Sequence, residues 1–210
     1  MVTFYVNHNQ IKASKGTSVL TACLNKGIYI PNLCHIEGDG IPAAACRLCF
    51  IAIEGKDKPV AACTIKVQEN LRVLTDTPLI RQLQKTALRL LLSVHKVDCK
   101  NCHANKRCEL QRMARFLKVG LHCKPFESYI PEKEIDSSHP ALIHYPQRCV
   151  LCGKCVRTCR DRNQNAFLIF AKKGFQTHIR FFDGLLNNKD CLDCGACAAI
   201  CPVGALALKS

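Results

Sequence analysis

The number and spacing of the cysteines constrain this chain more than any other feature. Its 210 residues include 17 cysteines, and all but two fall into four closely spaced sets, one of which also has a histidine. The N-terminal residues lack the charged, apolar and small-residue layout of a secretory signal peptide, so we expect a cytoplasmic protein. Cytoplasmic thiols are kept reduced, so this cysteine content predicts metal ligation rather than disulfides. No apolar run approaches the roughly 18 residues of a membrane span, and no transmembrane segment is expected.

The most informative pattern is a run of four cysteines that occurs twice in the C-terminal third. Two, two and three residues separate the cysteines of each run, as in bacterial ferredoxins. There, three thiolates hold one 4Fe-4S cubane and the fourth ligates the other cluster, whereas a zinc site usually draws pairs of ligands from two separated loops. We therefore predict two 4Fe-4S clusters. Their ligands are Cys149, Cys152, Cys155 and Cys201 for the first, and Cys191, Cys194, Cys197 and Cys159 for the second.

A different pattern lies in the N-terminal third, where an isolated cysteine precedes a close pair and a fourth cysteine. It resembles the 2Fe-2S site of the ferredoxin domains in hydrogenases and complex I, and plant ferredoxins have shorter spacings at the start. Gly38, Gly40 and the alanines at 43–45 allow backbone N–H groups to approach cluster sulfurs. The resemblance implies a 2Fe-2S cluster, with zinc as the alternative. Its ligands are Cys34, Cys46, Cys49 and Cys63.

The remaining set combines one histidine with three cysteines, namely His95, Cys99, Cys102 and Cys108. Taken alone it is ambiguous, because the same ligands make a common structural zinc site. His95 also continues the apolar side of a predicted helix, where an ordinary core histidine is the plainer interpretation. Its place between a 2Fe-2S pattern and two ferredoxin runs favours a 4Fe-4S cluster with one histidine ligand.

This order of motifs covers nearly the whole chain and resembles one family of redox subunits. It is similar to the N-terminal region of iron-only hydrogenases, to the large iron-sulfur subunit of complex I, and above all to the diaphorase small subunit (HoxU type) of NAD-reducing hydrogenases. The complex I subunit does not keep both complete runs, and an iron-only hydrogenase needs a catalytic domain after residue 210. The resemblance implies one 2Fe-2S and three 4Fe-4S clusters. It also implies a flavin- and NAD(P)-binding diaphorase partner and the hydrogenase small and large subunits as further partners.

The predicted fold class is α+β, in three domains. Residues 1–77 should form a 2Fe-2S ferredoxin-like β-grasp domain with strands at 4–6, 10–13, 50–54, 60–64 and 71–74 and a helix at 18–25. Residues 78–140 should form a small helical domain around the histidine-ligated 4Fe-4S cluster, with an irregular connection from 124 to 146. Residues 141–210 should form a bacterial-type two-cubane ferredoxin domain, with a hairpin of strands 166–170 and 175–182.

No nucleotide-binding glycine loop, Walker loop or catalytic triad is present, so we predict no catalytic residues in this chain. It should relay single electrons within an NAD(P)-linked hydrogenase, or within a formate dehydrogenase, an electron-bifurcating enzyme or a complex I-like enzyme. A free-standing ferredoxin would usually be smaller and acidic. The spare Cys23 and Cys123 are interpreted as free thiols. The histidines without ligand spacing are taken as solvated or structural: His8, His35, His103, His122, His139, His144 and His178.

The formal charge of +14 raises a rival hypothesis, a zinc-bearing nucleic-acid-binding protein. Oxidised clusters are anionic, however, and the four predicted here would offset about seven of those charges. The chain has no Trp and only 4 Tyr, so stacking platforms for single strands are scarce. We therefore predict no nucleic-acid partner.

Overall fold

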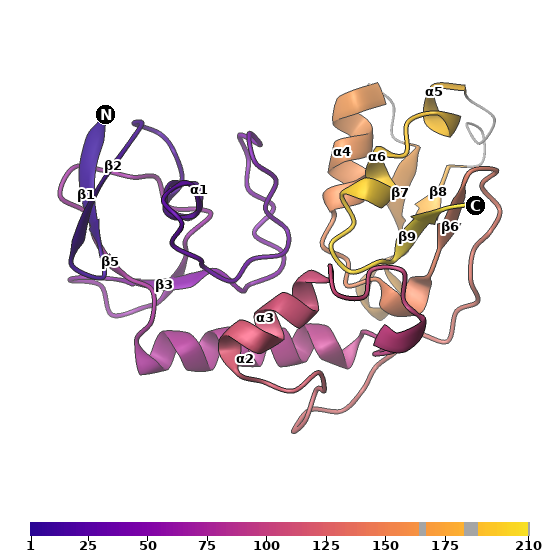
Figure 1. Ribbon diagram of the computed structural model, residues 1–210, viewed down its shortest axis with the longest axis horizontal. Coiled ribbons are helices and arrows are strands. Elements are labelled where there is room, and N and C mark those ends of the chain that lie inside the picture. The colour runs from indigo at the N-terminus through magenta and orange to yellow at the C-terminus, as the bar shows by residue number, and fades with distance from the viewer. Residues whose placement is uncertain (164–166, 183–188, 210) are drawn as a thin grey trace. The chain divides into compact units, whose positions relative to one another are not determined.

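The computed structural model describes residues 1–163, 167–182 and 189–209. The chain divides into two compact units, Met1–Leu88 with Leu117–Val119, and Arg89–Phe116 with Gly120–Ser210. Figure 1 labels the elements of both units. The predicted boundaries at 77/78 and 140/141 describe a finer division and stay predictions.

A five-stranded mixed sheet forms the first unit, in the order β2-β1-β5-β3-β4. Its strands are β1 (Val2–Val6), β2 (Asn9–Ala13), β3 (Phe50–Ile53), β4 (Val60–Ala61) and β5 (Arg72–Leu74). β1 pairs antiparallel with β2 and parallel with β5, so the predicted N-terminal hairpin is confirmed. The strand predicted at 60–64 ends early, because the N–H of Thr64 turns back to the carbonyl of Ala61.

Helix α1 (Val19–Asn25) forms where the sequence predicts it. The hydroxyl of Ser18 caps the helix by accepting from the N–H of Thr21 at 3.1 Å. Leu20 belongs to the same buried cluster as Phe4 and Ile51 of the sheet. The N–H of Leu20 also donates to the carbonyl of Ala62, which fixes α1 beside the segment that carries Cys63.

Helix α2 (Pro78–Ser93) begins with Pro78 at its first position, and the hydroxyl of Thr77 accepts from the N–H of Ile80 at 3.3 Å. The apolar spacing predicts a buried stripe that includes Leu90, with Gln84 on the polar face. The structure differs, because Leu90 is half exposed and Gln84 is fully buried. The amide of Gln84 donates to the carbonyl of Phe50 and accepts from Arg81, so burial leaves it hydrogen-bonded.

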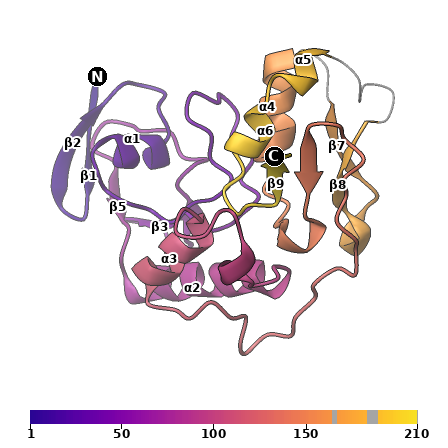
Figure 2. The same cartoon turned by 45° about the vertical axis from the view of Figure 1, so that its right-hand side comes forward.

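The described part of the second unit contains two small antiparallel sheets. Strand β6 (Leu142–His144) pairs with β9 (Leu206–Leu208), and β7 (Leu168–Ala171) pairs with β8 (His178–Phe181). Helix α4 (Lys154–Asn163) packs against β7 and the short α6 (Ala196–Ala199), as Figure 2 shows. The remaining helices are α3 (Glu109–Leu117), α5 (Lys189–Leu192) and the 3-10 turns η1 (Cys99–Asn101), η2 (Pro146–Arg148) and η3 (Gly174–Gln176).

Two sequence predictions need correction in the second unit. Residues 142–144, expected within an irregular connection, form β6, because the C-terminal residues after Cys201 supply a partner strand. The strand expected at 175–182 begins only at His178, since residues 174–176 form the turn η3. Residue 166, the expected start of the other hairpin strand, lies outside the described residues. No helix within the described parts of the chain is long and apolar enough to cross a membrane.

Candidate metal centres

The four cysteines of the first set are buried in the first unit and approach one another in two pairs. The Sγ atoms of Cys34 and Cys46 lie 3.4 Å apart. The thiol of Cys49 donates a hydrogen bond to the sulfur of Cys63, which is the largest cause of a lowered Cys63 pKa and a raised Cys49 pKa. Cys34 also acts to raise the pKa of Cys63, and Cys46 to raise that of Cys49, so all four sulfurs lie near one another, with two hydrogen-bonded pairs among them.

The loop that carries the first set bends through unusual backbone conformations. Ala44 and Arg47 have φ angles of 48° and 51°, in the left-handed region that residues other than glycine seldom adopt. The N–H of Leu48 donates to the sulfur of Cys46 and acts to lower its pKa, whereas the neighbouring Cys34 and burial raise it. A backbone donor from Leu48 therefore faces sulfur here, and the approach expected at Gly38, Gly40 and the alanines at 43–45 stays a prediction.

The histidine set lines one hollow in the second unit. His95, Cys99, Cys102 and Cys108 all contribute to its wall. Cys108 immediately precedes α3, and the N–H groups of Leu110 and Gln111 donate to its sulfur. Burial is the largest cause of the raised pKa of Cys108, followed by those opposing backbone bonds and by the nearby Cys102 and Cys99.

His95 is buried, and a hydrogen bond from its ring determines which ring nitrogen carries the hydrogen. Its Nδ1 lies 2.8 Å from the carbonyl oxygen of Arg148. A carbonyl only accepts, so Nδ1 carries the hydrogen and Nε2 of the neutral ring keeps a lone pair. Burial lowers the pKa of His95 and so favours that neutral form. A metal-ligating imidazole commonly has this arrangement, with its second nitrogen bonded to a backbone carbonyl.

The segment after Cys201 packs against the histidine set, which the sequence does not predict. The carbonyl of Pro202 accepts from the N–H of Glu109 at 2.9 Å. Gly204 has a φ of +68°, and a Cβ added there would lie 2.7 Å from the Cβ of Ala104 and 3.1 Å from the sulfur of Cys102. Only glycine fits this contact. A glycine two residues after Pro202 is the one sequence signal that could have indicated that the backbone here approaches another segment closely.

The two ferredoxin runs cross over in space. Burial raises the pKa of Cys149 to about 12, and the neighbouring sulfurs of Cys152 and Cys201 raise it further. Burial also raises the pKa of Cys197 to about 12, and here the neighbours include Cys159 and Cys191. Cys201 therefore lies near Cys149 and Cys155 of the first run, and Cys159 lies near Cys191 and Cys197 of the second.

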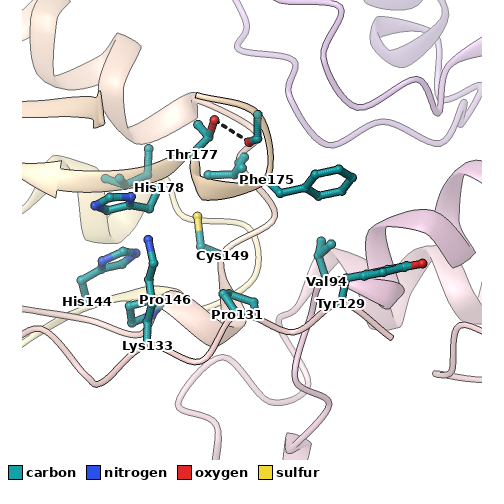
Figure 3. Close-up of a pocket in the computed structure, with 13 residues that line it drawn as sticks. Val94, Tyr129, Pro131, Lys133, His144, Pro146, Cys149, Phe175, Thr177 and His178 are labelled. Atoms are coloured by element: carbon teal, nitrogen blue, oxygen red, sulfur yellow. Dashed lines mark hydrogen bonds between the residues drawn. The ribbon is translucent and has the colours of Figure 1, made fainter. Parts of the chain in front are cut away.

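A surface hollow opens beside Cys149 in the second unit (Figure 3). Lys133, His144 and His178 contribute nitrogen atoms to its wall, and Phe175 and Tyr129 contribute aromatic rings whose centroids lie 6.3 Å apart. The side chain of His144 is buried, and among the described residues its Nε2 has no hydrogen-bond partner. Cys149 lines this hollow and is partly exposed.

The two spare cysteines belong to none of the four predicted sets, although Cys23 shares a buried core cluster with Cys49 and Cys63. Cys23 is fully buried in the core of the first unit, where burial raises its pKa to about 12. Cys123 is partly exposed, and its thiol donates to the carbonyl of Phe126 at 3.3 Å. Within the described residues, no three His, Cys, Asp or Glu side chains converge to hold a single metal ion. Cluster ligands bind different irons and need no common point of convergence.

Three known families match successive parts of the chain. Residues 1–78 match a 2Fe-2S iron-sulfur cluster binding domain, residues 84–120 match the NADH-ubiquinone oxidoreductase-G iron-sulfur binding region, and residues 148–205 match a 4Fe-4S dicluster domain. A solved chain from an NAD+-reducing nickel-iron hydrogenase in the H2-reduced state is 31% identical and superposes with a TM-score of 0.86. That match covers 100% of this chain and 88% of the other.

The chain belongs to the iron-sulfur subunits of NAD(P)-linked oxidoreductases.

Longer members of this iron-sulfur subunit family contain the same region. The NADPH-Fe(3+) oxidoreductase subunit alpha of Geobacter sulfurreducens is 32% identical over 100% of this chain but only 24% of its own length. The NADH-ubiquinone oxidoreductase 75 kDa subunit of Reclinomonas americana is 31% identical over 100% of this chain and 30% of its own length. The NADP-reducing hydrogenase subunit HndD of Solidesulfovibrio fructosivorans is 29% identical over 98% of this chain, with 36% of its own length covered. The chain thus spans about a quarter to a third of these relatives.

Proposed function

We propose that this subunit relays single electrons between a flavin- and NAD(P)-binding diaphorase partner and a hydrogenase partner. One 2Fe-2S cluster would be held by Cys34, Cys46, Cys49 and Cys63, and three 4Fe-4S clusters by the histidine set and the two crossed ferredoxin sets. The observation that carries the proposal is that all four ligand sets are assembled within one small chain. The N-terminal sheet with α1 supports a β-grasp arrangement for the first of them.

The first set fits a 2Fe-2S cluster better than a single zinc ion. In such a cluster each of the two irons takes two protein ligands, so four thiolates should approach as two couples. The two hydrogen-bonded pairs, Cys34 with Cys46 and Cys49 with Cys63, would supply those couples. A zinc ion would instead bring all four sulfurs around one point.

The ligands in the second unit fit cubanes for two separate reasons. The sulfurs that neighbour Cys149 and Cys197 support crossed ligation, in which Cys201 completes the first cluster and Cys159 the second. The hydrogen bond from Nδ1 of His95 to Arg148 leaves Nε2 available as a neutral fourth ligand beside the three cysteines of its hollow.

Iron-sulfur clusters accept and release one electron with potentials set by net charge, hydrogen bonds to sulfur and exposure. The residues of this chain supply two of these influences, hydrogen bonds to sulfur and charge. The N–H groups of Leu48, Leu110 and Ala205 donate to ligand sulfurs, with the Ala205 nitrogen 3.2 Å from the sulfur of Cys201. The excess of Lys and Arg behind the formal charge of +14 offsets the negative charge that bound clusters would bring.

The hydrogenase partner, and a HoxU-type role with it, is supported by the match to a chain of the NAD+-reducing nickel-iron hydrogenase. A second candidate is an equivalent role in another NAD(P)-linked enzyme of the formate dehydrogenase, electron-bifurcating or complex I-like kind. The 32% identity to the Geobacter NADPH-Fe(3+) oxidoreductase subunit favours keeping it.

The test is to isolate the native complex anaerobically through a tag on this subunit and to follow its EPR signals. We expect NADH or NADPH to reduce at least one cluster of this chain, and hydrogen gas to reduce the same clusters without nucleotide. Reduction by nucleotide alone would support the second candidate. A complex whose clusters respond to neither donor, or a colourless protein that contains zinc, would contradict the proposal.

A further inference from the structure

A buried histidine outside every ligand set contacts a ligand sulfur in the second unit. The side chain of His139 is 1% exposed, and its Nε2 lies 3.4 Å from the Sγ of Cys191. The sequence offers no ligand spacing around His139, so it could be interpreted only as a solvated or structural residue. Its contact comes from the fold, because the two residues are 52 positions apart.

A second hydrogen bond determines which ring nitrogen of His139 carries the hydrogen. The backbone N–H of Ala141 donates to Nδ1 at 3.1 Å. An N–H group cannot accept, so Nδ1 must present its lone pair and the hydrogen must be on Nε2. His139 therefore donates an N–H to the sulfur of Cys191. This is the reverse of His95, in which Nδ1 donates to a carbonyl and Nε2 keeps the lone pair.

The ring of His139 is also held in place from its face. Its centroid lies 4.9 Å from that of Phe181, which is buried in strand β8. A donor that is fixed before the charge on its acceptor changes does not have to reorganise when that change occurs. The position of the N–H is thus set by Ala141 and Phe181 rather than by the sulfur it serves.

Adding an electron to an iron-sulfur cluster increases the negative charge on its sulfur atoms, so an N–H donor to sulfur stabilises the reduced state more than the oxidised state. We propose that His139 is a positioning residue that raises the reduction potential of the cubane held by Cys191. This inference rests on the proposed function, because it needs Cys191 to be a cluster ligand. Under this inference a side-chain N–H donates to the sulfur of Cys191, as backbone N–H groups donate to the sulfurs of Cys108 and Cys201.

A redox titration of three variants tests the inference. His139→Phe removes the donor but keeps a ring of similar size against Phe181. His139→Gln keeps an N–H donor on a side chain that can reach the sulfur. His144→Phe is the matched control, because His144 is also a buried histidine of this unit and no residue in the described ranges hydrogen-bonds to its Nε2.

We expect His139→Phe to lower the potential of one 4Fe-4S signal, with about a tenfold loss of preference for the reduced form, equivalent to about 59 mV for one electron. The other signals should keep their potentials. His139→Gln should lie nearer to wild type, and His144→Phe should leave the same signal unchanged. Iron and sulfide content, measured on every variant, separates a changed potential from a lost cluster.

Two results would overturn the inference while leaving the proposed function intact. One is a fully loaded His139→Phe protein with unchanged potentials, and the other is an equal shift in His144→Phe. If His139→Phe fails to fold, pulsed EPR on the wild-type subunit labelled with 15N-histidine decides the matter. The Cys191 cubane is identified as the one whose EPR signal is lost in Cys191→Ser. A weak coupling of a histidine nitrogen to this cubane supports the inference, and the absence of that coupling contradicts it. A wild-type protein without reducible clusters would instead refute the proposed function.

Discussion

The imidazole of His95 donates its Nδ1 hydrogen to the carbonyl oxygen of Arg148 across 2.8 Å, although the two residues are 53 positions apart. This bond links the end of the α2 segment to the residue just before Cys149. It also fixes the tautomer in which Nε2 can bind iron. The bond leaves the lone pair of Nε2 available for a metal, and this leads to the first prediction.

His95→Cys should keep a cubane but lower its reduction potential. A thiolate adds one negative charge where the neutral imidazole had none, which disfavours the reduced form. His95→Ala should leave one iron without a protein ligand and give a labile or three-iron cluster. EPR-monitored redox titration and iron content measure both effects. Wild-type signals and potentials in both variants would mean that His95 is only a core residue.

Cys201→Ser should damage the cluster of the first ferredoxin run, although Cys201 lies in the second. The reason is the crossed arrangement, in which the sulfur of Cys201 is a neighbour of Cys149 and Cys155. Cys159→Ser is the matched variant and should damage the other cluster, because Cys159 is a neighbour of Cys191 and Cys197. EPR spectra of the two variants should lose different signals, each matching the loss caused by Cys152→Ser or Cys194→Ser. Loss confined to the cluster of the same run would contradict crossed ligation.

Gly204→Ala should weaken the histidine-ligated centre. The new Cβ would meet the Cβ of Ala104 and the sulfur of Cys102, and the backbone would stay in the left-handed region. The expected loss is about 3 kcal/mol of unfolding free energy, from backbone strain and overpacking together. Gly174→Ala is the control, since Gly174 has a similar φ of +58° but nothing within 4 Å, and it should lose only about 1 kcal/mol. Thermal unfolding and the rate of iron loss to a chelator measure the difference, and equal behaviour of the two variants would refute the contact.

The burial of His144 predicts a pH dependence of stability. Burial lowers its pKa to about 4, whereas the unfolded chain takes up the proton near 6.5. Unfolding is therefore favoured as the pH falls from 6.5 towards 4, and this contribution to stability is complete above that range. Between about pH 7.5 and 6 the wild type should lose about 1 kcal/mol through this residue. Anaerobic thermal unfolding should show a smaller loss in His144→Phe, and equal losses would contradict the prediction.

Local chemistry explains why much of this fold could be predicted from the sequence. Ser18 before an apolar run, Thr77 before Pro78 and a turn at Asn7 are signals that depend on a few neighbouring residues, and all three are confirmed. Gln84 is different. Its polar side chain suggests exposure, but the carbonyl of Phe50 supplies a buried partner that no local pattern indicates.

In the candidate centres, too, the sequence predicts the features that depend on neighbouring residues and misses those that depend on distant ones. Cysteine spacing indicates the ligands because every set contains a pair of cysteines separated by two residues, whereas the residues around the ligands come from distant segments. Arg148 at His95, Gly204 at Cys102 and His139 at Cys191 are all brought in by the fold. The pairing of β6 with β9, which the sequence does not predict, joins the segment that follows His139 to the end of the chain.

The central claim is that four iron-sulfur clusters occupy the four ligand sets, and the most direct test is the metal content of the anaerobically purified protein. One 2Fe-2S and three 4Fe-4S clusters require about 14 iron atoms and about 14 acid-labile sulfides per chain. Iron, sulfide and zinc are measured on the same brown sample. We predict iron and sulfide near those values with little zinc, whereas reproducible zinc with little iron or sulfide would contradict the account.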